Sequence, residues 1–325
     1  MKLVRLLLAP LCFLAGLVAG ATPGLAVLVC VPTMDDVLFG TVDMTTNTVV
    51  DLTFNFQVSC TGGGANQRIR ICPSIGSGTG GANGTGSQRF MLNGATQLAY
   101  NLYSNAARTT VWGSYFWGLP PTPPTINLRL NGAGNGTVNT NVYARIFSGQ
   151  TSKPSGFYSS SFTGSHTLIS YNVRGIIGTC SAADLDNATT SPFIVSATND
   201  PSCTVSASNL TFPDTGFLDT AVAQTSTINV TCPSTLPYRI ALDGGLSGAS
   251  DPTQRKLTLG AEEITYGLYR DNAYALPWGS TAGVNTAAGT GTGVAQGFTV
   301  YGRIPAQTTP TPGIYDDTIV VTVTY

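Results

Sequence analysis

Two stretches of this chain repeat one another, and this duplication constrains the fold more than any other feature. Leu98–Gly113 (LAYNLYSNAARTTVWG) aligns without gaps on Ile264–Gly279 (ITYGLYRDNAYALPWG). The flanking residues recur in the same order: Cys30, Phe39, Cys60, Gln88, Arg89, Val142–Ile146 and Gly156–Tyr158 in the first copy, and Cys203, Phe212, Cys232, Gln254, Arg255, Val300–Ile304 and Gly313–Tyr315 in the second. The chain is therefore predicted to contain two diverged copies of one domain, spanning residues 27–198 and 199–325.

Short alternating runs of apolar and polar residues dominate both copies. They are rich in Val, Ile, Thr and Tyr and are bounded by Gly, Pro and Asn, a pattern typical of β-strands. The runs that predict strands are 51–58, 68–71, 126–130, 167–173, 227–230, 298–304 and 318–325. Sustained helical periodicity with capping residues is missing. We therefore predict an all-β protein with a β-sandwich in each copy.

The N-terminus is predicted to be a secretory signal. Residues 1–26 contain Lys2 and Arg5, then an apolar run, then small residues suited to cleavage after Ala21 or Ala26. The apolar run is short for a membrane span, and no later stretch approaches the roughly 20 apolar residues that a spanning helix needs. We expect an exported protein without a membrane span.

Cysteine usage agrees with export into an oxidising compartment. Cys12 leaves with the signal, and six cysteines remain, for which about fifteen pairings exist. The repeat makes Cys30–Cys60 and Cys203–Cys232 equivalent pairs and leaves Cys72 and Cys180 for one another. No CxxC motif or Cys/His pair suggests a metal site, and no cofactor is expected.

Composition and the few titratable residues argue against nucleic-acid binding and catalysis. Charged residues are 10% of the chain, against a usual figure of about 25%, and the formal net charge is −1, so no basic patch is expected. The single histidine, His166, falls in a predicted strand region. Asp316 and Asp317 are adjacent, and neighbouring strand residues point to opposite faces. We therefore predict that the protein is not an enzyme.

The second copy carries a set of motifs that resembles the spore coat protein U domain. They are Cys203-Thr-Val, Leu210-Thr-Phe212, Asn229-Val-Thr-Cys232, Leu268-Tyr269, Trp278-Gly279, Tyr301-Gly-Arg303-Ile304 and Gly313-Ile-Tyr315. Such domains are similar to the pilin subunits of archaic chaperone–usher pili of Gram-negative bacteria. The resemblance implies an immunoglobulin-like sandwich that lacks its last strand. A periplasmic chaperone, and after passage through an outer-membrane usher an adjacent pilin subunit, would supply that strand.

The two ends of the mature chain suggest a place in such a fibre. Few residues separate the expected cleavage sites from Cys30, which leaves little room for a strand to donate, and the second copy closes at Tyr325 without a further strand. We expect a subunit at the pilus tip on the cell surface. Ser191–Ala197 (SPFIVSA) is either a strand that completes the first copy or part of an interdomain linker.

The largest difference between the copies is an aromatic and proline-rich segment that starts at Ser114. Its candidate surface-binding residues are Tyr115, Phe116, Trp117, Leu119, Pro120 and Pro121. One interpretation is an exposed hydrophobic loop that grips an abiotic or host surface during biofilm formation, as the resemblance to tip adhesins implies. The other places the three aromatic residues in a strand. A structural coat or fibre subunit and an exported carbohydrate-binding module are the alternative functions. The glycine-rich loop 76–86 is expected to be a flexible hairpin.

Overall fold

The computed structural model of the chain describes residues 27–116, 122–174, 178–181, 184 and 187–325. Its regular elements are β-strands and two short 3₁₀ helices, Met44–Thr46 and Gly164–Thr167, so the all-β prediction is confirmed for this part of the chain. No helix within these ranges is long and apolar enough to cross a membrane. The predicted signal, residues 1–26, lies outside the described residues.

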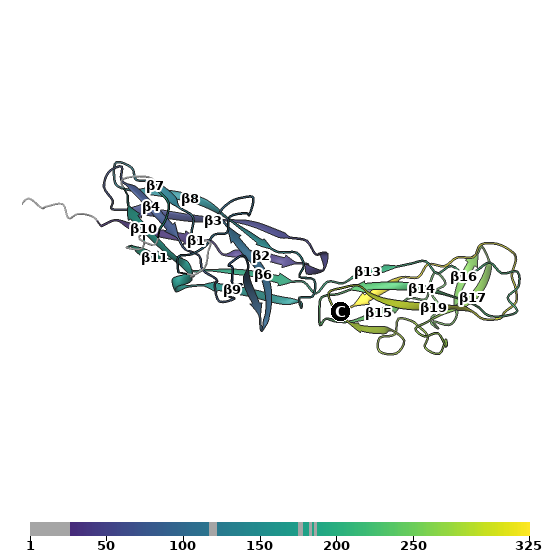
Figure 1. The fold of residues 1–325 in the computed structure, drawn as a ribbon. Helices are drawn as coiled ribbons and strands as arrows, with labels where there is room; N and C mark the ends of the chain where they lie inside the picture. The colour runs from purple at the N-terminus through teal and green to yellow at the C-terminus, as the bar shows by residue number, and fades with distance from the viewer. Residues whose placement is uncertain (1–26, 117–121, 175–177, 182–183, 185–186) are drawn as a thin grey trace, which may run out of the picture.

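The first copy forms two sheets around one hydrophobic core (Figure 1). The larger sheet has the strand order β1 (Val29–Met34), β3 (Val50–Thr61), β8 (Gly136–Ile146), β6 (Thr96–Tyr103), β5 (Arg89–Asn93), β9 (Gly156–Phe162), β12 (Phe193–Asn199) and β2 (Val37–Val42). The smaller has the order β11 (Ala188–Thr190), β10 (Leu168–Val173), β4 (Arg68–Pro73) and β7 (Ile126–Arg129). Phe56 of β3 and Ile71 of β4 belong to one buried cluster, so the core lies between the sheets.

The second copy repeats this plan with fewer strands. One sheet has the order β13 (Thr204–Ala207), β14 (Val222–Thr231), β19 (Gln296–Ile304), β17 (Glu262–Tyr269) and β16 (Arg255–Leu259). The other has the order β18 (Ala287–Thr290), β15 (Pro237–Leu242) and β20 (Val321–Thr324). A separate buried cluster contains Ile240 and Val300, one from each sheet. Every strand run predicted from the sequence overlaps a strand of the structure.

Strand β12 is the element that makes the first copy more complete than the second. It pairs antiparallel with β9 and parallel with β2, and so lies between them. Its Phe193, Val195 and Ala197 side chains are buried, and the Phe193 ring stacks on Phe162 with the ring centroids 4.4 Å apart. The strand predicted within 191–197 is therefore confirmed as a sheet strand, and the linker interpretation of this segment is wrong.

Three disulfides join the pairs that the repeat predicts: Cys30–Cys60, Cys72–Cys180 and Cys203–Cys232. Cys30 and Cys60 lie directly opposite one another on β1 and β3. Closure of a loop by such a bond typically stabilises a domain by about 2–4 kcal/mol. Two of the three bonds are therefore shared by the copies, whereas Cys72–Cys180 belongs to the first copy alone.

A buried arginine holds the same position in each copy. The Arg89 guanidinium donates to the carbonyl oxygens of Ile75, Gly76 and Trp112. Arg255 does the same for Leu242, Asp243 and Trp278 in the second copy. Burial lowers the pKa of Arg89 to about 10, so it stays charged at neutral pH. Carbonyl acceptors replace the water that a buried cation loses, and the arginine thereby ties three chain segments together.

Candidate functional site

The start of the aromatic segment lies in a turn at the surface of the first copy. Trp112 and Ser114 are buried, Tyr115 is partly buried, and the Phe116 side chain is 41% exposed. Tyr115 and Phe116 lie in a turn, so the strand interpretation is wrong for these two residues. The other candidate surface-binding residues lie outside the described part of the chain: Trp117, Leu119, Pro120 and Pro121.

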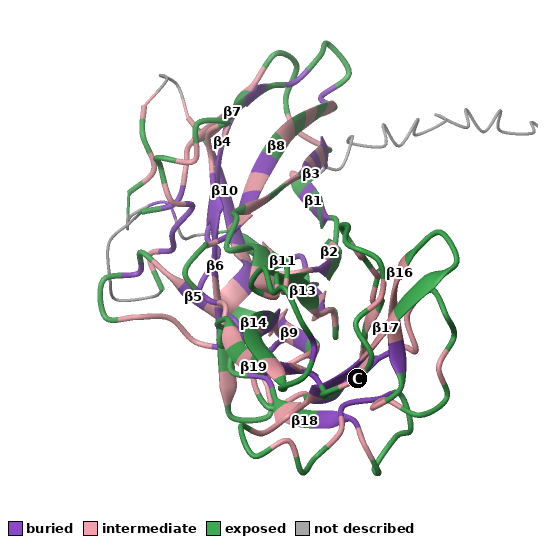
Figure 2. Cartoon of the chain, turned by 90° about the vertical axis from the view of Figure 1, so that its right-hand side faces the viewer, coloured by how far each residue is buried: buried purple, intermediate pink, exposed green. Residues whose placement is uncertain are grey.

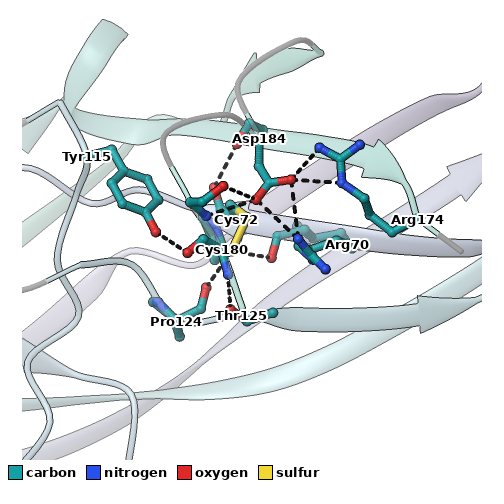
Figure 3. Close-up of a disulfide and its surroundings, with 12 residues drawn as sticks. Arg70, Cys72, Tyr115, Pro124, Thr125, Arg174, Cys180 and Asp184 are labelled. Carbon is teal, nitrogen blue, oxygen red and sulfur yellow. Dashed lines mark hydrogen bonds and ion pairs between the residues drawn. A yellow bond between two sulfur atoms is a disulfide. The ribbon is translucent and has the colours of Figure 1, made fainter. Parts of the chain in front are cut away.

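The segment around Cys180 crosses the base of this turn (Figure 3). We call the described residues 178–181 and 184 the strap. The Cys180 carbonyl oxygen accepts a hydrogen bond from the Tyr115 hydroxyl, and the Cys180 N–H donates to Thr125 Oγ1 at 2.6 Å. Burial, with a smaller contribution from the negative charge of Asp184, raises the pKa of Tyr115, so the hydroxyl keeps its proton. One residue of the strap therefore contacts both flanks of the aromatic segment.

Two anchors fix the strap to the smaller sheet. The Cys72–Cys180 disulfide joins it to β4, with the two Cα atoms 5.7 Å apart. Asp184, whose side chain is only 3% exposed, lies between Arg70 of β4 and Arg174, with nitrogen–oxygen distances of 3.3 and 2.9 Å (Figure 3). Burial alone would raise the pKa of Asp184, but hydrogen bonds from Arg174 and Ser181 outweigh it and hold the pKa below its ordinary value.

The glycine-rich loop packs against the sheet, contrary to the flexible hairpin expected. Gly76, Gly78 and Gly80 are buried, and a Cβ at Gly80 would lie 1.7 Å from the Phe90 carbonyl oxygen. The Thr79 N–H donates to the Ser161 carbonyl of β9. Glycine is needed here because two backbones approach too closely for any side chain.

Two of the three titratable residues that the sequence singled out, His166 and Asp317, have hydrogen-bonding partners. His166 Nδ1 accepts a hydrogen bond from the Gly78 N–H at 3.2 Å. The Asp317 carboxylate accepts from the Tyr266 hydroxyl at 2.7 Å and from the Leu246 N–H, whereas Asp316 is exposed. Within the described ranges no group of three or more His, Cys, Asp and Glu residues is arranged to hold a metal ion.

A second exposed feature is the segment 313–325, which lies at an edge of each sheet of the second copy. Gly313 and Tyr315 correspond to Gly156 and Tyr158 of β9, so the first part of this segment, 313–319, occupies the place of the strand that β12 covers in the first copy. In the part of the chain that the structure describes, the only β-pairing of 313–319 is an isolated bridge between Asp316 and Thr258, and β20 is an edge strand.

The side chains along this edge differ sharply from their counterparts in the first copy. Tyr325 is 55% exposed, whereas its counterpart Tyr171 is 9% exposed. Tyr315 is half-buried, whereas its counterpart Tyr158 is fully buried. Ile314 is 86% exposed, and its counterpart Phe157 is exposed as well. Strand β10 of the first copy carries a long buried stretch (Figure 2), whereas β20, at the matching place in the second copy, alternates between intermediate and exposed residues. The edge offers unpaired backbone and apolar side chains, the two features that a further strand would recognise.

Fold and surface together define a class: a duplicated, disulfide-linked β-protein with an aromatic surface turn on one copy and an open sheet edge on the other. The Spore Coat Protein U domain matches residues 23–165 and 189–322. The chain therefore belongs to the Spore Coat Protein U domain family, as the sequence resemblance predicts. No curated protein matches the chain.

Two solved structures align with about nine-tenths of the chain at low sequence identity. One is a chain of the crystal structure of the CsuC–CsuE chaperone–tip adhesion subunit pre-assembly complex from archaic chaperone-usher Csu pili of Acinetobacter baumannii, with a TM-score of 0.55 and 16% identity, covering 91% of this chain and 100% of that chain. The CupB6 tip adhesin from Pseudomonas aeruginosa has a TM-score of 0.39 and 11% identity, with 90% and 93% covered. The first likeness shows that the two-copy fold is shared with that protein.

Proposed function

We propose that the chain is the tip adhesin of an archaic chaperone–usher pilus. Residues 27–198 form the adhesin domain and 199–325 the pilin domain, each an immunoglobulin-like sandwich. The observation that carries the proposal is the contrast between the copies, because β12 completes the first sheet and the matching edge of the second stays open. The fold shared with a protein solved as a chaperone–tip adhesion subunit complex supports it.

The open edge gives the second domain its partners. We propose that this domain lacks its last strand and that a periplasmic chaperone covers the 313–325 edge until, at an outer-membrane usher, an adjacent pilin subunit inserts a strand. A long unprotected edge with exposed apolar residues is an aggregation hazard, so a partner in the periplasm is needed. The first domain has its strand already and faces outward at the cell surface of a Gram-negative bacterium.

The aromatic segment gives the first domain its adhesive function. It has only a short counterpart in the second copy, where the Gly279 N–H donates to the Asn285 carbonyl. Phe116 and the aromatic and proline residues after it are the proposed contacts with an abiotic or host surface. Such contacts need neither a metal nor a catalytic group, and they suit attachment during biofilm formation.

Substitution of Phe116 by serine tests the adhesive function directly. Because full burial of a phenylalanine side chain contributes about 1.5–3 kcal/mol, we expect Phe116→Ser to weaken retention on an octyl-coated sensor surface by roughly tenfold. Phe157→Ser is the matched control, since Phe157 is also an exposed phenylalanine of the first copy, on β9. Equal retention of the parent protein and both variants would contradict the proposed binding surface.

Two further experiments distinguish the tip adhesin from the two alternative functions. The parent protein mixed with its chaperone should give a capped complex that does not polymerise, and long homopolymers would instead indicate a structural coat or fibre subunit. A free glycan that competes away binding would indicate a carbohydrate-binding module, whereas binding to an octyl surface is not expected to respond to sugars.

A further inference from the structure

The aromatic segment and the strap are both additions of the first copy, and they meet at one place. The equivalent residues Trp112 and Trp278 donate their indole N–H to the carbonyls of Pro73 and Ile240, so these two residues occupy equivalent positions. The residue before each is then also equivalent, and Arg239 stands in the second copy where Cys72 stands in the first. The second copy forms its hydrophobic cluster without a strap or an aromatic segment. The shared fold therefore does not require the Cys72–Cys180 bond.

We propose that the strap is a positioning device for the binding surface. The Cys180 backbone holds Tyr115 and Thr125, and thereby fixes the direction in which Phe116 faces an apolar surface. The inference rests on the proposed function, because it assigns a role to residues that do not themselves contact the surface. Under this proposal, Tyr115, Thr125, Cys72 and Cys180 are positioning residues for adhesion.

The geometry supports positioning more than packing. Both backbone polar groups of one residue are used, the N–H toward Thr125 and the carbonyl toward Tyr115, so the two flanks of the segment share a single support. Thr125 immediately precedes β7, whose Ile126 pairs with Ile71 next to Cys72, so the support stands on paired strands. A group held in its bound conformation loses less conformational entropy on contact, which increases affinity without a new contact.

Asp184 gives the strap a second anchor beside the covalent one. Its carboxylate accepts hydrogen bonds from the Ser181 N–H and hydroxyl as well as from two arginines. The strap is therefore fixed to the sheet at two points, by the disulfide at Cys180 and by the ion pairs at Asp184. The negative charge of Asp184 is paired with Arg70 and Arg174, so no uncompensated negative charge lies beneath the aromatic turn.

Variants that remove single polar atoms test the proposal in the full chain purified from the periplasm. Tyr115→Phe removes the hydroxyl but keeps the ring, and Thr125→Val keeps the shape but removes the acceptor. From the typical contribution of one hydrogen bond, we expect each to weaken retention on an octyl-coated surface about threefold to fivefold. Cys72→Ala combined with Cys180→Ala should weaken it further. Faster hydrogen exchange of the Cys180 amide should accompany Thr125→Val.

Tyr115→Phe distinguishes positioning from simple hydrophobicity. It makes the turn more apolar, so a surface that only recognises apolar area should bind this variant as well as the parent or better. Tyr143→Phe, which removes a tyrosine hydroxyl from β8 in the other sheet, is the control. Parent-like retention of Tyr115→Phe and Thr125→Val, together with loss in Phe116→Ser, would overturn the strap inference and leave the proposed function standing. Equal retention in Phe116→Ser would overturn the proposed function itself.

Discussion

At the scale of single residues, Asp184 is the group whose charge most clearly has a structural role. Hydrogen bonds from Arg174 and Ser181 lower its pKa in spite of burial, which opposes ionisation. A carboxylate with a lowered pKa in the folded protein stabilises that state at every pH above its unfolded pKa of about 3.9. The contribution is lost as the pH falls through the lower folded value, when the carboxyl group takes up a proton.

Asp184→Asn should therefore lower the melting temperature of the first domain at neutral pH and have progressively less effect below about pH 4. As the pH falls from the unfolded pKa through the lower folded pKa, Asp184 of the parent protein also takes up a proton, so the two proteins should converge. Thermal unfolding followed by tryptophan fluorescence between pH 2.5 and 7 measures the difference. A gap that stays constant down to the lowest pH would mean that the charge of Asp184 does not stabilise the strap.

The surroundings of the buried charged residues could not be predicted from the sequence. The repeat identifies Arg89 and Arg255 as equivalent, but not as buried, because burial depends on carbonyl groups that three separate segments bring together. The partners of Asp184 are similarly hidden, since Arg70 lies 114 residues away along the chain. The cysteine pairs could be predicted, because the duplication itself restricts them.

At the scale of elements, alternation predicted the strand near 191–197, whereas its place in the sheet could not be read from the sequence. The segment is locally typical of a strand, with apolar residues at every second position. Its parallel pairing with β2 joins residues more than 150 positions apart, and only the closed fold determines such a neighbour. The glycine-rich loop was predicted incorrectly for the same reason, since close backbone packing leaves no local signal.

The first copy also supplies a test of the open edge. Residues 188–199, which form β11 and β12, pair with β10 and β9 in the first copy. A second copy of these residues, joined after Tyr325 through a short turn, should pair with 313–325 and raise the melting temperature of the second domain by roughly 5–15 °C. Calorimetry of the fused protein measures the shift.

The matched control for this fusion replaces the added strand's equivalents of Phe193 and Val195 by serine. It keeps the length and the backbone hydrogen bonds but removes the two apolar side chains that are buried in the first copy. We expect it to stabilise the second domain far less. Equal melting temperatures for the fused protein, its control and the parent would argue against a strand-accepting edge.

At the scale of the whole molecule, the two copies lie end to end and meet at a small junction (Figure 1). Pro154 of the first copy makes a bridge with Ser234 of the second. The Asn199 side chain, at the end of β12, donates to the carbonyls of Lys153 and Pro154 and accepts from the Met44 N–H. The completing strand of the first copy therefore supports the same loop that contacts the second.

Gly293 of the second copy lies against the backbone of the first copy at this junction. It has a φ of +79°, and a Cβ there would lie 2.1 Å from the Thr151 carbonyl oxygen of the first copy. Gly283 has a similar φ of +76°, yet the nearest atom to its Cβ would be the end of the Arg239 side chain at 3.5 Å. Alanine at either position would have similar backbone strain. Only at Gly293 would its methyl group also clash with the backbone of the first copy.

Gly293→Ala should therefore loosen the junction, whereas Gly283→Ala should not. Both variants lose about the same stability from an alanine in the left-handed region, so a comparison between them isolates the contact across the junction. Small-angle scattering of the two variants measures the distribution of end-to-end lengths, which should broaden for Gly293→Ala alone. Identical distributions would mean that the copies are not held by this contact. For the proposed tip adhesin, a stiff junction would keep the aromatic turn away from the fibre that the second domain is proposed to join.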